Sequence, residues 1–507
     1  MLQSWFAVAG GALAFPPLGA VLLWMKRTGI KTKILGTLLI LVVGVAELFL
    51  VYGMRVELNG AGHPRFTFRD PKRHMEELER SRSEQSAGTV PAESPEPVAA
   101  EPVAAVVPVS NAASAPAAEP VKETAVSAPW PFFRGPKGDG VYRQGPILTK
   151  WPSSGLQRLY KQPIGGGYAS FVIAGGRAFT IEQRRDKEFV AAYDLKTGRE
   201  LWTHSYAAFF SESMGGDGPR ATPTWHQGRV YSLGATGEMR VLDDKTGKVI
   251  WSKNILKEAG AENIMWAMSA SPLIVDNTVV VQPGGPSSSS VVAYDLETGK
   301  KVWGSLNDGA SYTTPMLVDF DGKRQIITAT ASRLVGLEPS NGKLLWEHPW
   351  VTQYDVNATQ PILVDANRFV MSSGYGHGAA LIEVKDNKAK AIWENTRLKT
   401  RFNTGVLHNG YVFGLDESIL ACIRVSDGNQ MWKGGRYGYG QLLLAGDHII
   451  VLAESGELAL VKATPEKHDE IAKFDAIEGK TWNVPAMADG YLLVRNLAEM
   501  ALFRIAP

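Results

Sequence analysis

The chain has 507 residues, and 53 Lys and Arg residues against 51 Asp and Glu residues give a formal net charge of +2. The basic residues are scattered and matched by acidic ones, so nothing in the charge balance indicates nucleic-acid binding and no nucleic-acid partner is expected. The 45% hydrophobic content is typical of a globular protein, and the length allows one large domain with extensions. Cys422 is the single cysteine, which excludes an intrachain disulfide and a four-cysteine metal site.

The first 54 residues predict a transmembrane helical hairpin, with helices at about 4–25 and 34–54. Each apolar run is long enough to span a hydrocarbon core of about 30 Å. A cleaved signal peptide fits less well, because no basic stretch precedes the first run and a second full-length run follows it. The basic loop at 26–33 favours a cytoplasmic loop with both ends of the hairpin outside, whereas the basic residues at 55–73 argue for the opposite orientation.

Residues 55–128 predict a short charged helix followed by a disordered tether. Asp70 is a suitable N-cap and Pro71 suits the first helical position, so a helix is expected over 70–85. Its charges fall on nearly all faces, which indicates a solvated helix or a stalk. Residues 86–128 are almost wholly Ala, Pro, Val, Glu and Ser, a composition that buries too little apolar surface to fold.

A repeated phrase dominates residues 129–507. It reads AYDLKTGRELW at 192–202, VLDDKTGKVIW at 241–251 and AYDLETGKKVW at 293–303, with looser copies at 336–346 and 422–432. Each copy predicts a strand, a tight turn whose Gly supplies a positive φ, and a second strand that carries a Trp. A mostly β unit that recurs every 40–50 residues is typical of a β-propeller.

Two features of the sequence indicate the number of blades. The aromatic residue of the phrase recurs at Trp202, Trp251, Trp303, Trp346, Trp393, Trp432 and, in degenerate form, Phe474. Eight further tight turns precede these phrases, so one blade lacks its last strand, and residues 156–164 supply it with Tyr160 in the Trp position. The sequence therefore predicts an all-β, eight-bladed β-propeller closed by an N-terminal strand, with seven blades as the alternative. The recurring Trp residues are expected to dock each blade against its neighbour, and residues 130–142 to pack against the side of the domain.

The Ala-x-Asp-x-x-Thr-Gly-x-x-x-Trp phrase resembles the tryptophan-docking repeat of pyrroloquinoline quinone (PQQ)-type propellers. That superfamily includes quinoprotein alcohol dehydrogenases and BamB-like assembly proteins. Residues 130–140 and the phrase DGPRATP at 217–223 resemble its membrane-anchored bacterial branch. The resemblance implies a propeller in the periplasm, tethered to the bacterial inner membrane. It specifies fold better than function, because the same ring serves enzymes and scaffolds.

Loops that enter the innermost strands present the candidate ligand-binding residues at the channel mouth. These are Tyr168, Arg220, Trp266, Tyr312, Asp355, Asn357, Asn403, Gln441, Trp482 and Asn483. Such a ring suits a planar anionic cofactor, because Arg pairs with carboxylates, an aromatic ring stacks, and Asp with Asn can ligate Ca²⁺. Alternatively, the same side chains complete the inner strands and hydrogen-bond their loops.

The catalytic inventory favours a binding role. Quinoprotein dehydrogenases usually carry adjacent cysteines over the quinone and acidic residues that bind Ca²⁺, whereas Asp355 is the one candidate base in these loops and no haem-attachment motif exists. The nine histidines form no His-x-x-x-His pair, so no metal site is expected. We therefore predict a non-catalytic scaffold that binds extracytoplasmic protein partners without a cofactor. The alternatives are a PQQ- and Ca²⁺-dependent alcohol or sugar dehydrogenase and a carbohydrate-binding propeller.

Overall fold

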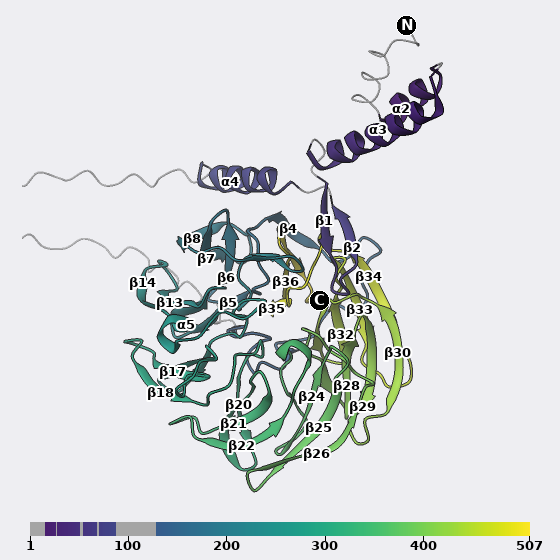
Figure 1. Cartoon of the computed structure of the whole chain (residues 1–507). Helices are drawn as coiled ribbons and strands as arrows, with labels where there is room; N and C mark the ends of the chain where they lie inside the picture. The colour runs from purple at the N-terminus through teal and green to yellow at the C-terminus, as the bar shows by residue number, and fades with distance from the viewer. Residues whose placement is uncertain (1–15, 27, 51–53, 68–69, 88–127) are drawn as a thin grey trace, which may run out of the picture.

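A computed structural model describes residues 16–26, 28–50, 54–67, 70–87 and 128–507. The last of these ranges forms a ring of eight blades around a central axis, and the N-terminal elements lie on one side of the ring (Figure 1). This confirms the predicted all-β, eight-bladed propeller.

Blades 1 to 4 each contain four antiparallel strands in chain order. Blade 1 comprises β5 (Val172–Ala174), β6 (Arg177–Arg184), β7 (Lys187–Asp194) and β8 (Glu200–Ala207). Blade 2 comprises β11 (Thr224–His226), β12 (Arg229–Leu233), β13 (Glu238–Asp243) and β14 (Val249–Asn254), followed by helix α5 (Ile255–Ala259). Blade 3 comprises β15 (Leu273–Val275), β16 (Thr278–Val281), β17 (Val291–Asp295) and β18 (Lys301–Ser305). Blade 4 comprises β19 (Met316–Phe320), β20 (Lys323–Ala329), β21 (Arg333–Leu337) and β22 (Leu344–Pro349).

Blades 5 to 8 repeat this order. Blade 5 comprises β23 (Ile362–Leu363), β24 (Arg368–Ser373), β25 (Gly378–Lys385) and β26 (Lys388–Asn395), preceded by the 3-10 turn η1 (Gln353–Asp355). Blade 6 comprises β27 (Val406–His408), β28 (Tyr411–Asp416), β29 (Ile419–Arg424) and β30 (Gln430–Arg436). Blade 7 comprises β31 (Gln441–Ala445), β32 (His448–Leu452), β33 (Glu457–Lys462) and β34 (Glu470–Asp475). Blade 8 comprises β35 (Ala486–Ala488), β36 (Tyr491–Arg495), β37 (Glu499–Arg504) and the N-terminal strand β4 (Arg158–Pro163).

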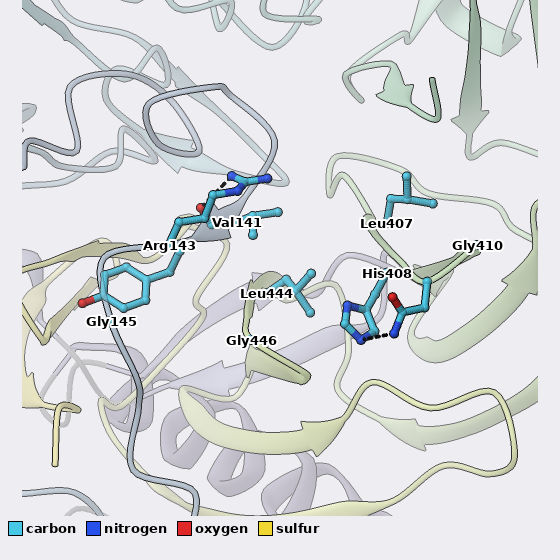
Figure 2. A pocket seen from close by; sticks show the side chains of 10 residues that line it. Val141, Arg143, Gly145, Leu407, His408, Gly410, Leu444 and Gly446 are labelled. Carbon is cyan, nitrogen blue, oxygen red and sulfur yellow. Dashed lines mark hydrogen bonds between the residues drawn. The ribbon is translucent and has the colours of Figure 1, made fainter. Parts of the chain in front are cut away.

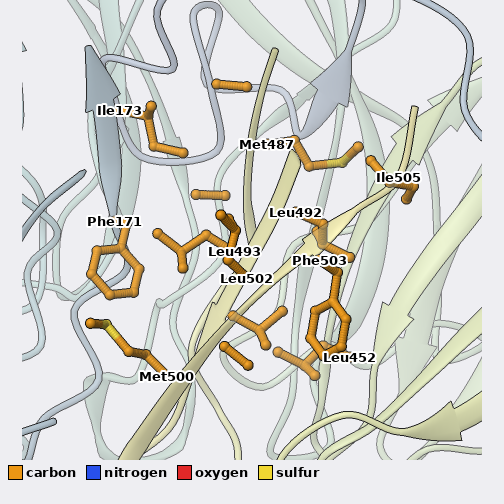
Figure 3. Close-up of a cluster of buried hydrophobic side chains, with 14 of the residues drawn as sticks. Phe171, Ile173, Leu452, Met487, Leu492, Leu493, Met500, Leu502, Phe503 and Ile505 are labelled. Carbon is orange, nitrogen blue, oxygen red and sulfur yellow. The ribbon is translucent and has the colours of Figure 1, made fainter. Parts of the chain in front are cut away.

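The ring closes as the sequence predicts. Strand β4 pairs antiparallel with β37, and Tyr160 lies opposite Leu502. A buried cluster joins blade 8 to both neighbours, with Phe171 from the first blade and Leu452 from the seventh packed around Leu502 and Phe503 (Figure 3). Closure by a strand from the other end of the domain leaves no open blade edge at the seam.

The Trp residues lie between adjacent blades. The indole N–H groups of Trp202, Trp251 and Trp303 donate to the carbonyls of Asp244, Leu296 and Pro339 in the next blade, at 2.9 to 3.1 Å. Trp393 and Trp432 make equivalent bonds to the carbonyls of Val425 and Thr464. The turn glycine of the next blade lies against each of the first three rings, as Gly299 does on Trp251, where an added Cβ would be 2.8 Å from the ring. Gly299 is therefore required both because its φ is 66° and because a Cβ would collide with the Trp251 ring.

Three joints depart from this pattern. Between blades 8 and 1, Tyr160 takes the Trp position against Gly198, and its hydroxyl has no hydrogen-bond partner among the described residues. Trp346 donates instead to Gln325 Oε1 within its own blade, because the corresponding turn of blade 5 contains Asp386 and Asn387 rather than Thr-Gly. In blade 7 the register places Ala472, opposite Leu460, at the bulge where the other blades carry Trp. Phe474, assigned to that position from the sequence, lies two residues further along β34 and packs on Phe503 of blade 8 at a centroid distance of 5.4 Å.

Residues 130–142 enter the ring instead of packing against its side. Trp130 forms a β-bridge with Ile173, the Pro131 carbonyl accepts from Trp225 N, and β3 (Val141–Tyr142) pairs parallel with β31. The Arg134 guanidinium is buried and donates to the carbonyls of Gly405 and Leu442 on inner strands of blades 6 and 7. Backbone pairing, the Arg134 guanidinium and the buried Trp130 and Phe132 side chains therefore hold this segment across the innermost strands, at the end where the first two strands of each blade are joined.

Helices α2 (Pro16–Trp24) and α3 (Ile30–Leu50) pack against each other through Leu22, Leu23 and Ile40. Parts of the predicted spans, residues 4–15 and 51–53, lie outside the described residues, as does the predicted tether over 88–127. None of the helices that the structure describes has the length and apolar character needed for a membrane crossing.

Two further elements follow α3 and lie on the propeller. Strands β1 (Arg55–Leu58) and β2 (Pro64–Thr67) form a hairpin, and α4 (Pro71–Ala87) packs along β4. The expected solvated helix is instead docked: Leu78 is 1% exposed, Arg82 donates to the Pro163 carbonyl, and Glu79 pairs with Arg185 of blade 1. Among the side chains described in α4, one buried apolar residue and several charged contacts hold the helix, without an apolar stripe.

The contact between turn glycine and Trp predicts unequal effects of Gly→Ala substitutions. Gly299→Ala and Gly322→Ala both place a side chain at positive φ, but only Gly299 faces a Trp ring, whereas the space around Gly322 is open. We expect both to lower the free energy of unfolding by about 1–2 kcal/mol, and Gly299→Ala by a further 1–3 kcal/mol or so from overpacking. Urea denaturation of the full chain measures both, and equal losses would contradict the docking role of the glycine.

Docking of α4 predicts a local effect of Leu78→Ala. Removal of this buried side chain should weaken the docked state of the helix by about 2 kcal/mol, which corresponds to roughly 30-fold faster amide exchange in 71–87. The exposed Glu77 provides the control Glu77→Ala. Hydrogen-exchange mass spectrometry should find the blades unchanged in both variants, and slow exchange of α4 in Leu78→Ala would show that the contact is unimportant.

Candidate functional site at the channel mouth

A cavity of about 160 Å³ lies on the ring axis, at the end where the chain enters each innermost strand. Every one of the eight entering loops contributes to its lining, for example through Tyr168, Trp266 and Val356. Phe133 reaches it from the segment that closes the opposite end of the channel. The cavity is therefore built by the ring as a whole.

Aromatic rings form its walls. The Trp482 ring stacks on Tyr168 at a centroid distance of 5.1 Å and packs at a tilt against Phe402 at 4.8 Å, so three blades share one aromatic wall. On the side of blades 3 and 4, Trp266 packs against Tyr312 at 5.8 Å. Such walls suit an apolar or planar group.

A charged pair lines the same cavity. Arg220 Nη2 lies 3.0 Å from Glu212 Oε1, and the guanidinium also stacks over Phe210 at 4.7 Å. The Glu212 carboxylate further accepts the backbone N–H groups of Met214 and Gly215. Burial lowers the pKa of Arg220 and the nearby Glu212 charge partly restores it. The two charges cancel, so the cavity presents little net charge to a ligand.

Tyrosine hydroxyls in this site remain protonated at neutral pH. Burial raises the pKa of Tyr168 well above its ordinary value, and the adjacent Arg220 opposes this shift. Burial likewise raises the pKa of Tyr312 to about 12. The Tyr168 hydroxyl donates to the Gly215 carbonyl at 2.7 Å. The Tyr312 hydroxyl accepts the Trp266 backbone N–H at 3.3 Å. Both hydroxyls stay neutral and are poor bases.

Six of the ten residues proposed from the sequence line the cavity, namely Tyr168, Arg220, Trp266, Tyr312, Gln441 and Trp482. The other four have different surroundings. Asp355 lies on the exposed turn η1. Asn357 is buried and donates to the Thr330 and Ala331 carbonyls, where it braces the loop.

Asn403 and Asn483 are also buried and do not line the cavity. Asn483 donates to the carbonyls of Gly167 and Ala169, which ties blade 8 to the loop that enters blade 1. The amide atoms of Asn403 have no hydrogen-bond partner among the described residues. Both residues lie in the loops from which they were selected, but the direction of an Asn side chain in irregular backbone follows no sequence period.

The sequence analysis considered one set of loops at the mouth and missed a second set. The loops between the second and third strands of each blade end on the same side, because neighbouring strands are antiparallel. Tyr375 of blade 5 reaches the cavity from such a loop, and Glu454 of blade 7 accepts the Trp482 indole N–H at 2.9 Å. Because strand direction alternates along the repeat, the sequence alone could have predicted that the loops between the second and third strands also lie at the mouth.

A second hollow lies at the opposite end of the ring, near Val141, His408 and Leu444 (Figure 2). It measures about 490 Å³, and the His408 ring there contacts the Asn409 amide at 3.0 Å. It lies between the turns of blades 6 and 7 and draws on few of the blades. The mouth cavity is the better candidate site, because all eight blades converge on it.

The lining of the mouth cavity offers few partners to PQQ with Ca²⁺. The cofactor is anionic, but the lining cation Arg220 is neutralised by Glu212, and Glu212 already accepts two backbone N–H groups. The volume of about 160 Å³ is below the roughly 300–1,000 Å³ of small-molecule sites. Among the residues that the structure describes, no three His, Cys, Asp or Glu side chains come together as a metal site.

Comparison with known proteins finds relatives among BamB proteins and quinone-dependent alcohol dehydrogenases. Residues 186–434 match the family described as outer membrane protein assembly factor BamB. BamB of Burkholderia pseudomallei is 22% identical over 359 residues, which cover 61% of this chain and 89% of that protein. The dehydrogenase subunit of the quinone alcohol dehydrogenase of Komagataeibacter europaeus is 32% identical over 123 residues, covering 22% of this chain and 16% of that protein.

A solved structure shares the fold. The quinohemoprotein alcohol dehydrogenase of Comamonas testosteroni superimposes with a TM-score of 0.56 at 13% identity, covering 74% of this chain and 80% of that chain. The repeat phrase, the eight blades and both groups of relatives agree. In its repeat phrase and its fold, the chain is similar to the PQQ-like β-propeller repeat proteins, the class that includes BamB and the quinoprotein alcohol dehydrogenases.

Proposed function

We propose that this protein is a non-catalytic propeller that binds protein partners through its channel-mouth face. The supporting observation is a set of exposed apolar side chains on the mouth loops. Phe209, Met265, Val351 and Tyr354 are 54% to 65% exposed, and they precede blades 2, 3 and 5. Exposed apolar residues gathered on one face are typical of protein interaction sites.

The backbone of one of these loops adds support. Tyr354 and Asp355 both have positive φ, 64° and 57°, which is unfavourable for residues other than Gly. The conformation projects Tyr354 into solvent. Its ring still makes a T-shaped contact with Tyr375 of the cavity wall, with the ring centroids 6.5 Å apart. A strained, exposed aromatic residue at the edge of a cavity suits an anchor for a partner surface.

The dehydrogenase alternative receives less support. The neutralised Arg220, the small cavity and the exposed position of Asp355 do not provide the cationic cradle and buried base that a bound quinone requires. The relatives described as outer membrane protein assembly factors share most of their length with this chain, whereas the dehydrogenase subunit shares 16% of its own. A protein-binding role is therefore favoured over an oxidoreductase.

The proposed surface predicts a site-specific loss of partner binding. Tyr354→Asp should reduce recovery of a crosslinked partner by about 30-fold, because loss of a central aromatic anchor costs about 2 kcal/mol or more. Val302→Asp provides the control, since Val302 is 53% exposed but lies on the outer strand β18. Crosslinking of the full chain in its native membranes, with quantitative mass spectrometry, measures both.

Equal recovery in the two variants would contradict the mouth surface. Quinone-dependent dye reduction by the full chain, after addition of PQQ, Ca²⁺ and an alcohol, would contradict the non-catalytic role. These two outcomes are independent, so each part of the proposal can fail by itself.

We further propose that residues 1–54 attach the protein to the bacterial inner membrane, with the propeller in the periplasm. Support comes from the two apolar runs in the sequence and from apolar side chains on α3, among which Leu39 and Val42 are 64% and 65% exposed. Exposure of this much apolar surface to water is unfavourable, whereas contact of the same surface with lipid is favourable.

Membrane attachment predicts resistance to alkaline carbonate extraction. The wild-type chain should remain with the membrane pellet, and protease added to spheroplasts should reach the propeller. Leu38→Asp combined with Val42→Asp should release the chain, because each charge costs about 2.5–3.5 kcal/mol at the centre of a membrane helix. Lys31→Asp is the control at the end of the same helix, and extraction of the wild type would contradict the attachment.

A further inference from the structure

The β1–β2 hairpin places its turn at the channel mouth, far in sequence from the blades that it contacts. The hairpin continues from the N-terminal helices toward the propeller (Figure 1). Asn59 braces the turn, since its side-chain oxygen accepts the N–H groups of Ala61 and His63 at 3.0 and 2.8 Å. The turn is thus shaped by its own residues before it meets the ring.

Charged side chains of the propeller bind the main chain of this turn. Gly60 N donates to Glu454 Oε1 at 2.7 Å, and Arg401 Nη1 donates to the Gly60 carbonyl at 2.7 Å. Lys480 Nζ donates to the Leu58 carbonyl at 3.3 Å. Both polar groups of the tip residue are therefore satisfied by ionised partners, which form stronger hydrogen bonds than neutral ones.

The contact with Tyr439 explains why the tip residue is Gly. The φ of Gly60 is ordinary, so its backbone conformation is open to other residues. A Cβ on Gly60, however, would overlap the Tyr439 ring. The next residue, Ala61, is exposed, so the requirement for Gly concerns the contact with the propeller.

The propeller holds Arg401, Tyr439 and Glu454 in place by contacts of its own. Glu417 Oε2 accepts both Arg401 Nε at 2.9 Å and the Tyr439 hydroxyl at 3.0 Å. Glu454 Oε2 accepts Tyr439 N, and its Oε1 accepts the Trp482 indole N–H as well as Gly60 N. Glu454 Oε1 thus links Gly60 of the turn to Trp482, whose ring lines the mouth cavity.

We propose that Arg401, Tyr439, Glu454 and Lys480 form a binding site for a glycine-tipped β-turn. The chain occupies this site in cis with Gly60, and a glycine-tipped turn of a second polypeptide binds when the hairpin leaves. The recognition is by main-chain groups and by exclusion of a Cβ, so it selects the shape of the turn and is tolerant of neighbouring side chains. This inference is independent of the proposed partner surface at Tyr354.

Hydrogen exchange tests the occupancy in cis. In the full chain, Gly60→Val should expel the turn and accelerate amide exchange over 55–67 by about tenfold or more. Ala61→Val is the matched control, because it adds the same side chain at an exposed position of the same turn. Unchanged exchange in Gly60→Val, or equal acceleration in both variants, would overturn the proposal.

Peptide binding tests the recognition. A backbone-cyclised peptide of residues 55–67, followed by fluorescence anisotropy, should bind the Gly60→Val chain at least about tenfold more tightly than the wild type, whose own hairpin competes at high effective concentration. The same peptide with Val in place of Gly60 should bind neither chain.

Each outcome of the peptide experiment is decisive. Failure of the Gly60→Val chain to bind the Gly peptide would overturn the site, provided that its exchange shows a released hairpin. Equal binding of the Gly and Val peptides would overturn recognition by exclusion of a Cβ. Unchanged thermal unfolding of the blades in both variants would show that loss of fold does not explain either result.

Discussion

The contact between a Trp of one blade and the turn glycine of the next is the interaction on which the ring depends. The glycine must adopt a positive φ to make the turn, and it must lack a Cβ to accept the ring face. The indole N–H then finds a carbonyl in the same turn, as Trp251 does at Leu296. One short phrase thus supplies turn geometry, packing and a hydrogen bond wherever it is intact.

Where the phrase lapses, apolar packing replaces it. At the joint between blades 4 and 5, Phe369 packs on both Trp346 and Phe320 at about 6 Å. Between blades 7 and 8, Phe474 and Phe503 make the contact in place of an indole. Both joints bury large side chains, so the ring tolerates loss of the hydrogen bond as long as the volume between the blades is filled.

The repeat made the fold and the ring closure predictable, since strand, turn and Trp recur at fixed spacing. It also predicted which loops reach the axis, and six of the ten residues taken from them line the cavity. Asn357 and Asp355 lie elsewhere because irregular loops set side-chain direction individually. The docked α4 was missed because Leu78 is the one fully buried apolar residue among the side chains described in this helix and the other contacts are polar, so no hydrophobic period signals the face.

The two ends of the channel differ in how they are closed. At the far end, residues 130–142 form bridges and a parallel strand pair with the inner strands, and the buried Arg134 cannot leave without exposing the carbonyls that it satisfies. At the mouth, a two-stranded hairpin contacts the ring chiefly through one turn, and Ala61 beside its tip faces solvent. A small contact of this kind releases more readily than an integrated strand. Exchange of polypeptide ligands therefore belongs at the mouth, beside the aromatic cavity.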